Sequence, residues 1–229
     1  MQLTIVCPVN DEKVLNKNLL ASKVVKTKQC PILLFKEPEN VMAALNEGKM
    51  AAKTTHVAFI HQDVFLPNTW YEDAMKALIN ITQLDSNFGA LGVAGAYNDA
   101  LLGYIGNRGK RWGSPLGFPK VAHTLDEMLI ITRKDNVWFD ESIPSVHLYG
   151  ADICIQYRMR DLRNYVINAY CDHNSSLPHK VPADFKVAEG YIRTKYMLVR
   201  PEFRVFPIRT TCTRIDKTEA KETKETKKK

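Results

Sequence analysis

The chain has 229 residues and a formal charge of +7, with 45% hydrophobic and 25% charged residues. These proportions are those of an ordinary globular protein, and no apolar run approaches the roughly 20 residues that cross a bilayer. The first residues read as a strand and not as a cleavable leader, so we expect a cytoplasmic protein without a transmembrane segment.

The basic charge is concentrated in part at the end of the chain. Residues 217–229 hold six lysines and three glutamates, which is +3 of the total and leaves +4 on the body. We expect one domain over residues 1–214 and a disordered Lys/Glu-rich tail over 215–229. A solubilising role is favoured for the tail, and peripheral contact with a membrane stays open as the alternative.

The five cysteines are scattered along the chain and form no CxxC pair. This spacing argues against a zinc site or a disulfide framework and favours buried, reduced thiols.

Short β-rich runs alternate with amphipathic stretches along the chain, which is the pattern of an α/β fold. In chain order, we expect a strand at 3–9, a helix at 11–28, a strand at 31–35, a helix at 40–53 with Asn40 as its N-cap, a strand at 56–60, a helix at 68–84, a strand at 88–96, a long glycine-punctuated loop at 98–121, a strand at 127–132, a helix at 151–162, a strand at 164–169 and a helix at 182–199.

The most informative polar cluster is His61-Gln62-Asp63, which follows the apolar run 56–60. Strands of an open α/β sheet deliver their last residues to the carboxyl edge, where ligands bind. A carboxylate there suits a divalent cation that bridges phosphate oxygens. Capping of the following turn is an equally good interpretation of Asp63 from the local pattern alone.

Three further positions carry polar groups of possible chemical use. Asp152 lies near the start of the helix expected at 151–162, so it is either a general base or a residue that stabilises the helix terminus. His173 follows a strand, and neutral imidazole is a good ligand for manganese, although a lone histidine is usually no ligand. Asn10 ends the first strand and either reads a nucleobase or caps a helix.

Several enzyme classes lack their motifs in this sequence. It contains no GxGxxG, no Walker A pattern and no nucleophile elbow, which disfavours dinucleotide, ordinary ATPase and serine-hydrolase chemistry. We also find no aromatic-basic motif of the kind that binds RNA or DNA, so a nucleic-acid partner is not expected.

The order of several segments resembles the family 2-type glycosyltransferases of the GT-A fold, and in particular a bacterial glycosyltransferase-like branch that includes a protein associated with streptomycin biosynthesis. The resemblance rests on segments spread over most of residues 1–176: Ala44-Leu45-Asn46-Glu47-Gly48, Phe59-Ile60-His61-Gln62-Asp63-Val64, Phe88-Gly89-Ala90-Leu91-Gly92-Val93-Ala94-Gly95, Phe139-Asp140-Glu141, His147-Leu148-Tyr149-Gly150-Ala151-Asp152 and Asp172-His173-Asn174-Ser175.

The resemblance implies a mixed, Rossmann-like sheet flanked by helices, with a nucleotide-diphosphate-sugar donor, Mn²⁺ or Mg²⁺, and a glycan or small hydroxyl acceptor. A UDP-sugar is the expected donor, and transfer with inversion is the implied reaction. Asp152 matches the catalytic base, although Ala151 stands where many relatives have glutamate. Asp63 and His173 match metal-site positions, and His61 replaces the first acidic residue of the usual motif. The donor-binding positions implied are Pro8, Asn10, Asn46, His61, Gln62, Asp126, Arg108 and Arg111.

The glycine-rich segment 103–117 is interpreted either as a lid over the donor, with its basic residues on the diphosphate, or as a surface loop without a ligand. Two other functions compete with transfer. A nucleotidyltransferase is disfavoured because residues 10–28 contain no glycine. A catalytically silent nucleotide-sugar-binding or scaffold protein of the same fold is the stronger alternative, since His61 and Ala151 replace the usual carboxylates.

Overall fold

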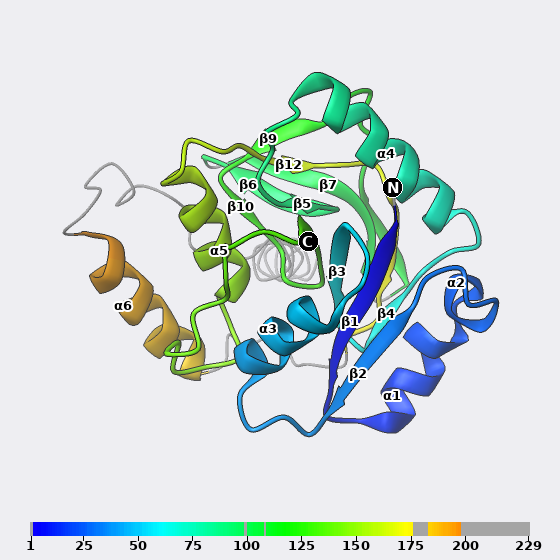
Figure 1. The fold of residues 1–229 in the computed structure, drawn as a ribbon, viewed down its shortest axis with the longest axis horizontal. Helices are drawn as coiled ribbons and strands as arrows, with labels where there is room; N and C mark the ends of the chain where they lie inside the picture. Colours follow the sequence, from blue (N-terminus) through cyan, green and yellow to red (C-terminus); the bar gives the residue numbers. More distant parts are fainter. Residues whose placement is uncertain (1, 99, 108, 176–182, 198–229) are drawn as a thin grey trace, which may run out of the picture.

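The computed structural model describes residues 2–98, 100–107, 109–175 and 183–197 (Figure 1). Its larger sheet contains the strands β1 (Leu3–Val9), β2 (Ile32–Lys36), β3 (His56–Ile60), β5 (Leu91–Gly92), β9 (Lys120–Ala122), β11 (Leu129–Arg133) and β12 (Asn164–Val166). Their spatial order is β2-β1-β3-β11-β5-β12-β9. The pairs β1–β2, β1–β3 and β12–β5 are parallel, whereas β11 runs antiparallel to both β3 and β5. The sheet is therefore mixed, as the resemblance implied.

A second sheet lies beside the first and reaches the carboxyl end of β3. Its strands are β4 (Val64–Phe65), β6 (Ala94–Tyr97), β7 (Ala100–Asn107), β8 (Lys110–Gly113), β10 (Thr124–Leu125) and β13 (Asp172–His173). They follow the order β10-β6-β7-β13-β4, and β8 pairs with β7. Strand β13 connects this sheet to the segment that follows β3, because it pairs with β4 on one side and β7 on the other.

Helices cover both faces of the larger sheet (Figure 1). They are α1 (Glu12–Lys17), the 3₁₀ turn η1 (Leu19–Ala21), α2 (Lys23–Lys26), α3 (Val41–Ala51), α4 (Trp70–Leu84), α5 (Tyr149–Arg158) and α6 (Ala183–Met197). Alternate residues of β1 explain the two layers: Ile5 packs in the core with α1, α2 and α4, whereas Val6 packs with α3, α5 and α6. Asn40 accepts a hydrogen bond from the Ala43 N–H, which confirms it as the N-cap of α3.

The helix expected at 11–28 is wrong as a single element. It is divided into α1, η1 and α2, because the Asn18 side chain donates to the Val14 carbonyl oxygen and ends the first helix. Ser22 then accepts a hydrogen bond from the Leu66 N–H through its hydroxyl, which fixes the second break against the chain after β4.

The long loop expected at 98–121 is also wrong, since most of it forms β7, β8 and β9. Some of its glycines allow neighbouring strands to approach closely, and others adopt backbone conformations that turns require. Gly113 has a φ of 76°, in the left-handed region that favours glycine. A side chain at Gly106 would collide with the Asp172 carboxylate, so glycine lets β7 lie directly against β13. The segment interpreted as a lid is thus largely strand within the described residues.

Two composition-based expectations can be compared with the fold. Cys7, Cys30, Cys154 and Cys171 are free and buried, as expected, and Cys212 lies outside the described residues. Among the helices of the described part of the chain, none combines the length and apolar character needed to span a bilayer. The tail at 215–229 lies outside the described residues, and the single-domain boundary at 214 stays a prediction.

Candidate functional site

The site begins where β3 ends. All five residues of β3 are buried, and the chain then turns, with the Val64 N–H donating to the His61 carbonyl oxygen at 3.2 Å. The His61 N–H donates to the Met128 carbonyl oxygen at 3.0 Å, which continues the ladder toward β11. Because the turn follows a central strand, it holds His61 and Asp63 at the carboxyl edge of the sheet.

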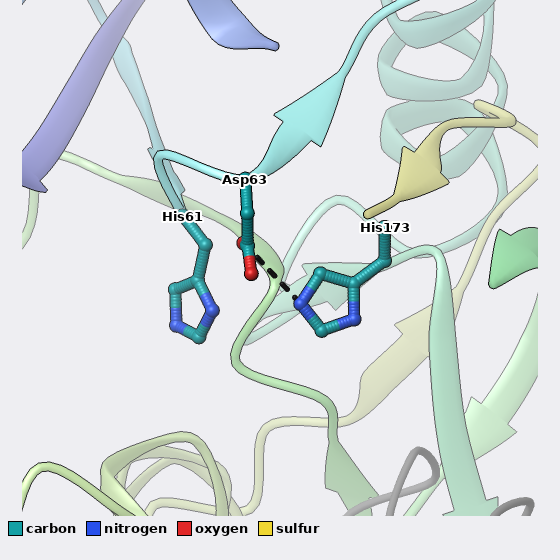
Figure 2. A group of neighbouring side chains, drawn as sticks. All are labelled: His61, Asp63 and His173. Carbon is teal, nitrogen blue, oxygen red and sulfur yellow. Dashed lines mark ion pairs between the residues drawn. The ribbon is translucent and has the colours of Figure 1, made fainter. Parts of the chain in front are cut away.

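Strand β13 supplies the third side chain from far along the sequence. His173 pairs with Val64 across the antiparallel β13–β4 ladder, and the Asn174 N–H donates to the Asp63 carbonyl oxygen at 2.9 Å. Figure 2 shows the rings of His61 and His173 on either side of the Asp63 carboxylate, with the His173 ring turned toward it. His173 Nε2 lies 3.3 Å from Asp63 Oδ1.

Asp63 is a partly buried carboxylate whose Oδ1 is a buried, unused acceptor. Its Oδ1 makes no hydrogen bond, since the 3.3 Å contact with His173 does not meet hydrogen-bond geometry. Burial on its own raises the pKa of Asp63, but contact with His173 and the charges of His173 and His61 outweigh it and leave the pKa below its usual value. The ionised form is therefore favoured, and an orphaned buried oxygen of this kind suits a cation.

His61 is fixed by a hydrogen bond on its outer side. Its Nε2 lies 2.8 Å from the hydroxyl oxygen of Tyr149, the first residue of α5. Burial lowers the pKa of His61, the Asp63 carboxylate opposes that shift, and His173 adds to it. A neutral imidazole is favoured, which is the form that coordinates a metal.

These three side chains fit a divalent metal. One candidate ligand atom from each of His61, Asp63 and His173 lies within 4.8 Å of the other two. The donor set is two imidazole nitrogens and one carboxylate oxygen, a combination that binds first-row transition metals. The arrangement supports the predicted metal positions Asp63 and His173 and adds His61, which was assigned to the donor, as a possible third ligand.

Asn10 and Gln62 are also brought together at this edge. Gln62 Oε1 accepts hydrogen bonds from the backbone N–H groups of Asn10 and Asp11 at 2.9 and 3.0 Å, and its amide donates to the Asn10 side chain. The helix cap is Asp11 and not Asn10, because the Asp11 carboxylate accepts from the N–H groups of Lys13 and Val14. The Asn10–Gln62 pair connects the ends of β1 and β3 beside the cluster of His61, Asp63 and His173.

Two buried carboxyl groups lie behind the cluster, between β10 and β11. Asp126 accepts a hydrogen bond from the Met128 N–H at 3.1 Å and acts electrostatically on His61. Burial, with the Asp126 charge as a second cause, raises the pKa of Glu127 to about 8. Glu127 accepts a 3.4 Å hydrogen bond from the Gly150 N–H at the start of α5. The predicted position Asp126 therefore belongs to the surroundings of the site.

Asp152, the predicted base, is fully occupied by protein partners. Lys195 Nζ lies 2.6 Å from its Oδ1, and the Tyr196 hydroxyl donates to the same oxygen at 2.7 Å. The Gln156 amide donates to Oδ2 at 2.8 Å. Lys195 also pairs with Asp140 at 2.7 Å. The carboxylate is completely buried and holds α6 against α5, so its role as a base stays a prediction.

The remaining predicted donor positions are distributed more widely. Asn46 is buried and exchanges hydrogen bonds with the backbone of Phe139, so its amide tethers that segment to α3. Arg111 lies on β8, with its guanidinium 6.0 Å from the centre of the Tyr170 ring. Pro8 is in β1, paired with Phe35, and Arg108 lies outside the described residues. No contact joins Asn46 or Arg111 to the cluster in the described part of the chain.

Tyr149 and Glu127 are the site residues that the sequence argument missed. Tyr149 falls inside a segment that carries the resemblance, but a tyrosine one position from a glycine gives no sign of its hydrogen-bond partner. Glu127 was assigned to the start of a strand, where a charged residue is usually solvated. Glu127 directly follows the already selected Asp126, and a search for paired acids would have found it; Tyr149 lies three residues before Asp152 and carries no such signal.

The comparisons with known proteins bear mainly on the fold. No family model matches the sequence. The product of ATP synthase subunits region ORF 6 of Fuscovulum blasticum is 27% identical over 133 residues, which cover 53% of this chain and 52% of that protein. The chain thus spans about half the length of this curated relative. The match does not bear on the predicted streptomycin-associated branch, which stays a prediction.

Solved glycosyltransferases share the architecture at low identity. The chain matches S. aureus TarS with a TM-score of 0.52 and 13% identity, over 86% of this chain and 66% of that one. TarS in complex with UDP-GlcNAc gives 0.51 and 14%, over 86% and 67%. The mannosyltransferase PcManGT from Pyrobaculum calidifontis, in complex with GDP-Man and Mn²⁺, gives 0.51 and 13%, over 84% and 70%. The fold is therefore the GT-A fold, as predicted.

Proposed function

We propose that this protein is a metal-dependent glycosyltransferase that takes a sugar from a nucleotide-diphosphate-sugar donor. The observation that carries the proposal is the buried, hydrogen-bond-free Oδ1 of Asp63 between two imidazoles, at the carboxyl edge of β3 in a GT-A fold. A buried carboxylate oxygen left without a hydrogen bond costs free energy unless another group, such as a cation, binds there.

The donor is proposed from the chemistry of the same edge. UDP-GlcNAc and GDP-Man are bound by the solved proteins TarS and PcManGT, so a nucleotide-sugar is the natural class of ligand. The Asn10–Gln62 pair presents amide groups next to the cluster, where they suit the polar edges of a nucleoside. A UDP-sugar is the proposed donor, and a glycan or small hydroxyl compound is the proposed acceptor.

The proposed reaction is direct displacement at the anomeric carbon with inversion. Bound Mn²⁺ or Mg²⁺ would supply a positive charge against the leaving diphosphate. His61, Asp63 and His173 would hold that ion. Asp152 would take the acceptor proton only after Lys195 and Tyr196 release its Oδ1, because that oxygen holds both partners at hydrogen-bond distance.

A second candidate is favoured by the same contacts of Asp152. A carboxylate that is completely buried and bonded to Lys195, Tyr196 and Gln156 is not available as a base in this arrangement. A catalytically silent nucleotide-sugar-binding protein would keep the donor site and lack turnover. The two candidates therefore predict the same binding and different chemistry.

Calorimetric titration with UDP and with GDP, in the presence and absence of Mn²⁺, tests the donor site. We expect one nucleotide to bind only with Mn²⁺, and we expect Asp63→Ala to abolish that binding. Glu47→Gln, on the exposed face of α3, is the control for a lost carboxylate. Absence of nucleotide binding under every metal condition would remove the transferase and the silent binder together.

Donor turnover then separates the two candidates. Release of UDP or GDP from UDP-GlcNAc or GDP-Man, followed by chromatography with and without simple sugar acceptors, is expected from a transferase. Nucleotide binding with no release above the protein-free rate would favour the silent binder.

A further inference from the structure

One face of the second sheet carries aromatic and charged side chains across four strands. Phe65 of β4 pairs with Asp172 of β13. Gly106 of β7 pairs with Asp172 on one side and with Arg111 of β8 on the other. Cross-strand partners point to the same face of a sheet, so these residues form one row. Tyr104 lies two positions before Gly106 in β7 and therefore points to the same face.

The aromatic rings on this face are not used by the hydrophobic cores. Ile105 and Trp112, which point to the opposite face, lie in or against the core beneath the sheet. Within the described residues, Phe65, Tyr104 and Tyr170 belong to neither core, and each is half-buried. The ring centres of Tyr104 and Tyr170 lie 4.9 Å apart, with their planes at 49°. Aromatic rings gathered outside the core are typical of a binding surface.

Polar groups surround these rings. The Tyr170 hydroxyl donates to Asp172 Oδ1 at 2.7 Å, and the Arg111 guanidinium lies 6.0 Å from the centre of the Tyr170 ring. Burial, with Asp172 as a second cause, raises the pKa of Tyr170 to about 12, so its hydroxyl keeps its proton at neutral pH. A Cβ at Gly106 would collide with Asp172 and approach the Tyr170 hydroxyl, so glycine lets both side chains lie across β7.

The composition of this surface favours a sugar over a charged ligand. The C–H groups on the face of a sugar ring are attracted to the negative face of an aromatic ring. Sugar hydroxyls both donate and accept hydrogen bonds, which matches one guanidinium and one carboxylate side by side. Asp172 and Arg111 also balance in charge, whereas a nucleic-acid strand requires an excess of positive charge along its backbone.

We infer that Phe65, Tyr104, Arg111, Tyr170 and Asp172 form a platform that binds a neutral glycan, with a sugar ring on the two tyrosines and its hydroxyls on Asp172 and Arg111. Neighbouring residues of a strand point to opposite faces, so Asp172 faces away from His173. The platform is thus distinct from the cluster of His61, Asp63 and His173. It goes beyond the proposed function, because it needs neither a metal nor a nucleotide.

A glycan held on the platform would have a defined use in a glycosyltransferase. Strand β13 carries Asp172 of the platform and His173 of the cluster at consecutive positions. A long acceptor bound on one face of this strand is kept at a high local concentration beside the donor site. The platform therefore favours an oligosaccharide over a single sugar as the bound molecule.

The first measurement uses the whole wild-type protein and neutral oligosaccharides. Cellopentaose, maltopentaose and the pentamer of N-acetylglucosamine are titrated separately by calorimetry, with a chelator present and no nucleotide. We expect at least one of them to bind, with one molecule per chain. Absence of binding for all of them at millimolar concentration would overturn the inference. Binding of poly(U) in their place would overturn it in favour of a nucleic-acid surface.

Substitutions of the tyrosines test the stacking. Tyr104→Ala and Tyr170→Ala should each weaken oligosaccharide binding about tenfold, because each removes one ring from the bound sugar. Tyr104→Phe keeps the ring and should bind within about twofold of the wild type. Tyr97→Ala is the matched control, since that tyrosine is also partly exposed and packs on a ring, His123, outside the platform.

Two outcomes would contradict the assignment of these residues. Undiminished affinity in both alanine variants of the platform would place the oligosaccharide elsewhere. Equal weakening in Tyr97→Ala and Tyr104→Ala would show that the loss is not specific to the platform. Circular dichroism of Tyr104→Ala and the retained binding of Tyr104→Phe separate a lost contact from a lost fold.

The outcomes also separate the platform from the proposed function. Tyr104→Ala should keep the Mn²⁺-dependent nucleotide binding of the wild type, and Asp63→Ala should keep oligosaccharide binding. Oligosaccharide binding that depends on Tyr104, in a protein that binds neither UDP nor GDP, would keep the platform and remove the donor site. Loss of oligosaccharide binding in Asp63→Ala would place the glycan at the cluster and overturn the platform.

Discussion

Asp63 and Asp152 are carboxylates at the ends of core elements, the first partly buried and the second completely buried, and their surroundings are opposite. Asp63 Oδ1 makes no hydrogen bond and lies between two imidazoles. Asp152 is bonded through both oxygens, to Lys195 and Tyr196 on one side and Gln156 on the other. The first arrangement leaves one acceptor oxygen unused, and the second is complete within the protein.

The comparison shows that burial does not by itself identify a functional carboxylate. A buried charge is stable when it is paired and hydrogen-bonded, and only one that lacks such partners is open to a ligand. The region around Asp63 thus keeps an acceptor oxygen available, whereas the region around Asp152 attaches α6 to α5.

The largest expected effect separates the two acids by stability. Asp152→Ala removes the hydrogen-bond acceptor of the buried Tyr196 hydroxyl and one of the two carboxylates that pair with Lys195. The free energy of unfolding should therefore fall by about 3 kcal/mol. Asp63→Ala should change it by less than about 1 kcal/mol, because its Oδ1 makes no hydrogen bond. Urea denaturation with a chelator present measures both changes. Equal losses in the two variants would contradict the claim that the two carboxylates differ in their contribution to stability.

A third buried carboxyl group sharpens the comparison because it keeps its proton. With the pKa of Glu127 raised to about 8, chiefly by burial, the folded protein holds a proton that the unfolded chain releases above about pH 4.5. The free energy of unfolding should therefore fall between about pH 4.5 and 8. Glu127→Gln should remove this slope and be more stable than the wild type at pH 7 by about 2.5 kcal/mol, relative to the difference at pH 5.

Urea denaturation at these two pH values checks the prediction for Glu127. The control is Glu47→Gln, which removes an exposed glutamate of α3 and should keep the wild-type slope. The same slope in Glu127→Gln and in the wild type would show that Glu127 is ionised in the folded protein.

Gly150 lies between the two regions, one residue from Tyr149 and two from Asp152. A Cβ there would come within 2.9 Å of Glu127 Cγ and 3.0 Å of the Leu125 carbonyl oxygen. Gly150→Ala should lower the free energy of unfolding by about 1 to 2 kcal/mol, because the first turn of α5 must shift. Thermal unfolding measures the loss.

Gly190 of α6 provides the matched control. Among the described residues, a Cβ there meets no atom within 4 Å, so Gly190→Ala should stabilise the protein by about 0.5 kcal/mol through a better helix former. A loss in Gly190→Ala as large as that in Gly150→Ala would contradict the steric explanation.

The smallest expected effect concerns the edge beside Asp63. Gln62→Ala removes the acceptor of the Asn10 and Asp11 N–H groups at an exposed position, so we expect a change below about 1 kcal/mol in global stability. Amide hydrogen exchange at Asn10 and Asp11 should nevertheless accelerate, because these groups lose their protection locally. Unchanged exchange at both amides would show that another group holds the turn.

Much of the fold could be predicted because its buried strands and helices have clear periodicity. The apolar run 56–60, followed directly by polar residues, predicts that His61 and Asp63 lie at a sheet edge. The region 98–121 could not be interpreted correctly, since its glycines serve close packing, as Gly106 does against Asp172, and resemble loop glycines in sequence.

The contacts within the site were harder to predict from the sequence than the helices and strands. The proximity of His173 to Asp63 depends on the pairing of β13 with β4, which no local pattern specifies. Two partners of Asp152, Lys195 and Tyr196, come from α6, more than 40 positions away, and their effect on its availability is a matter of tertiary packing. Local sequence identifies the polar residues, and long-range pairing decides which of their side chains lack a hydrogen-bond partner in the protein.

The distance along the chain between Asp63 and His173 has a consequence for the growing polypeptide. During synthesis, His61 and Asp63 leave the ribosome long before residue 173. The proposed metal-binding cluster therefore lacks His173 until nearly the whole sheet has emerged. Metal uptake would then report completion of the domain, and a bound ion would in turn hold β13, the last strand to arrive, in its place between β4 and β7.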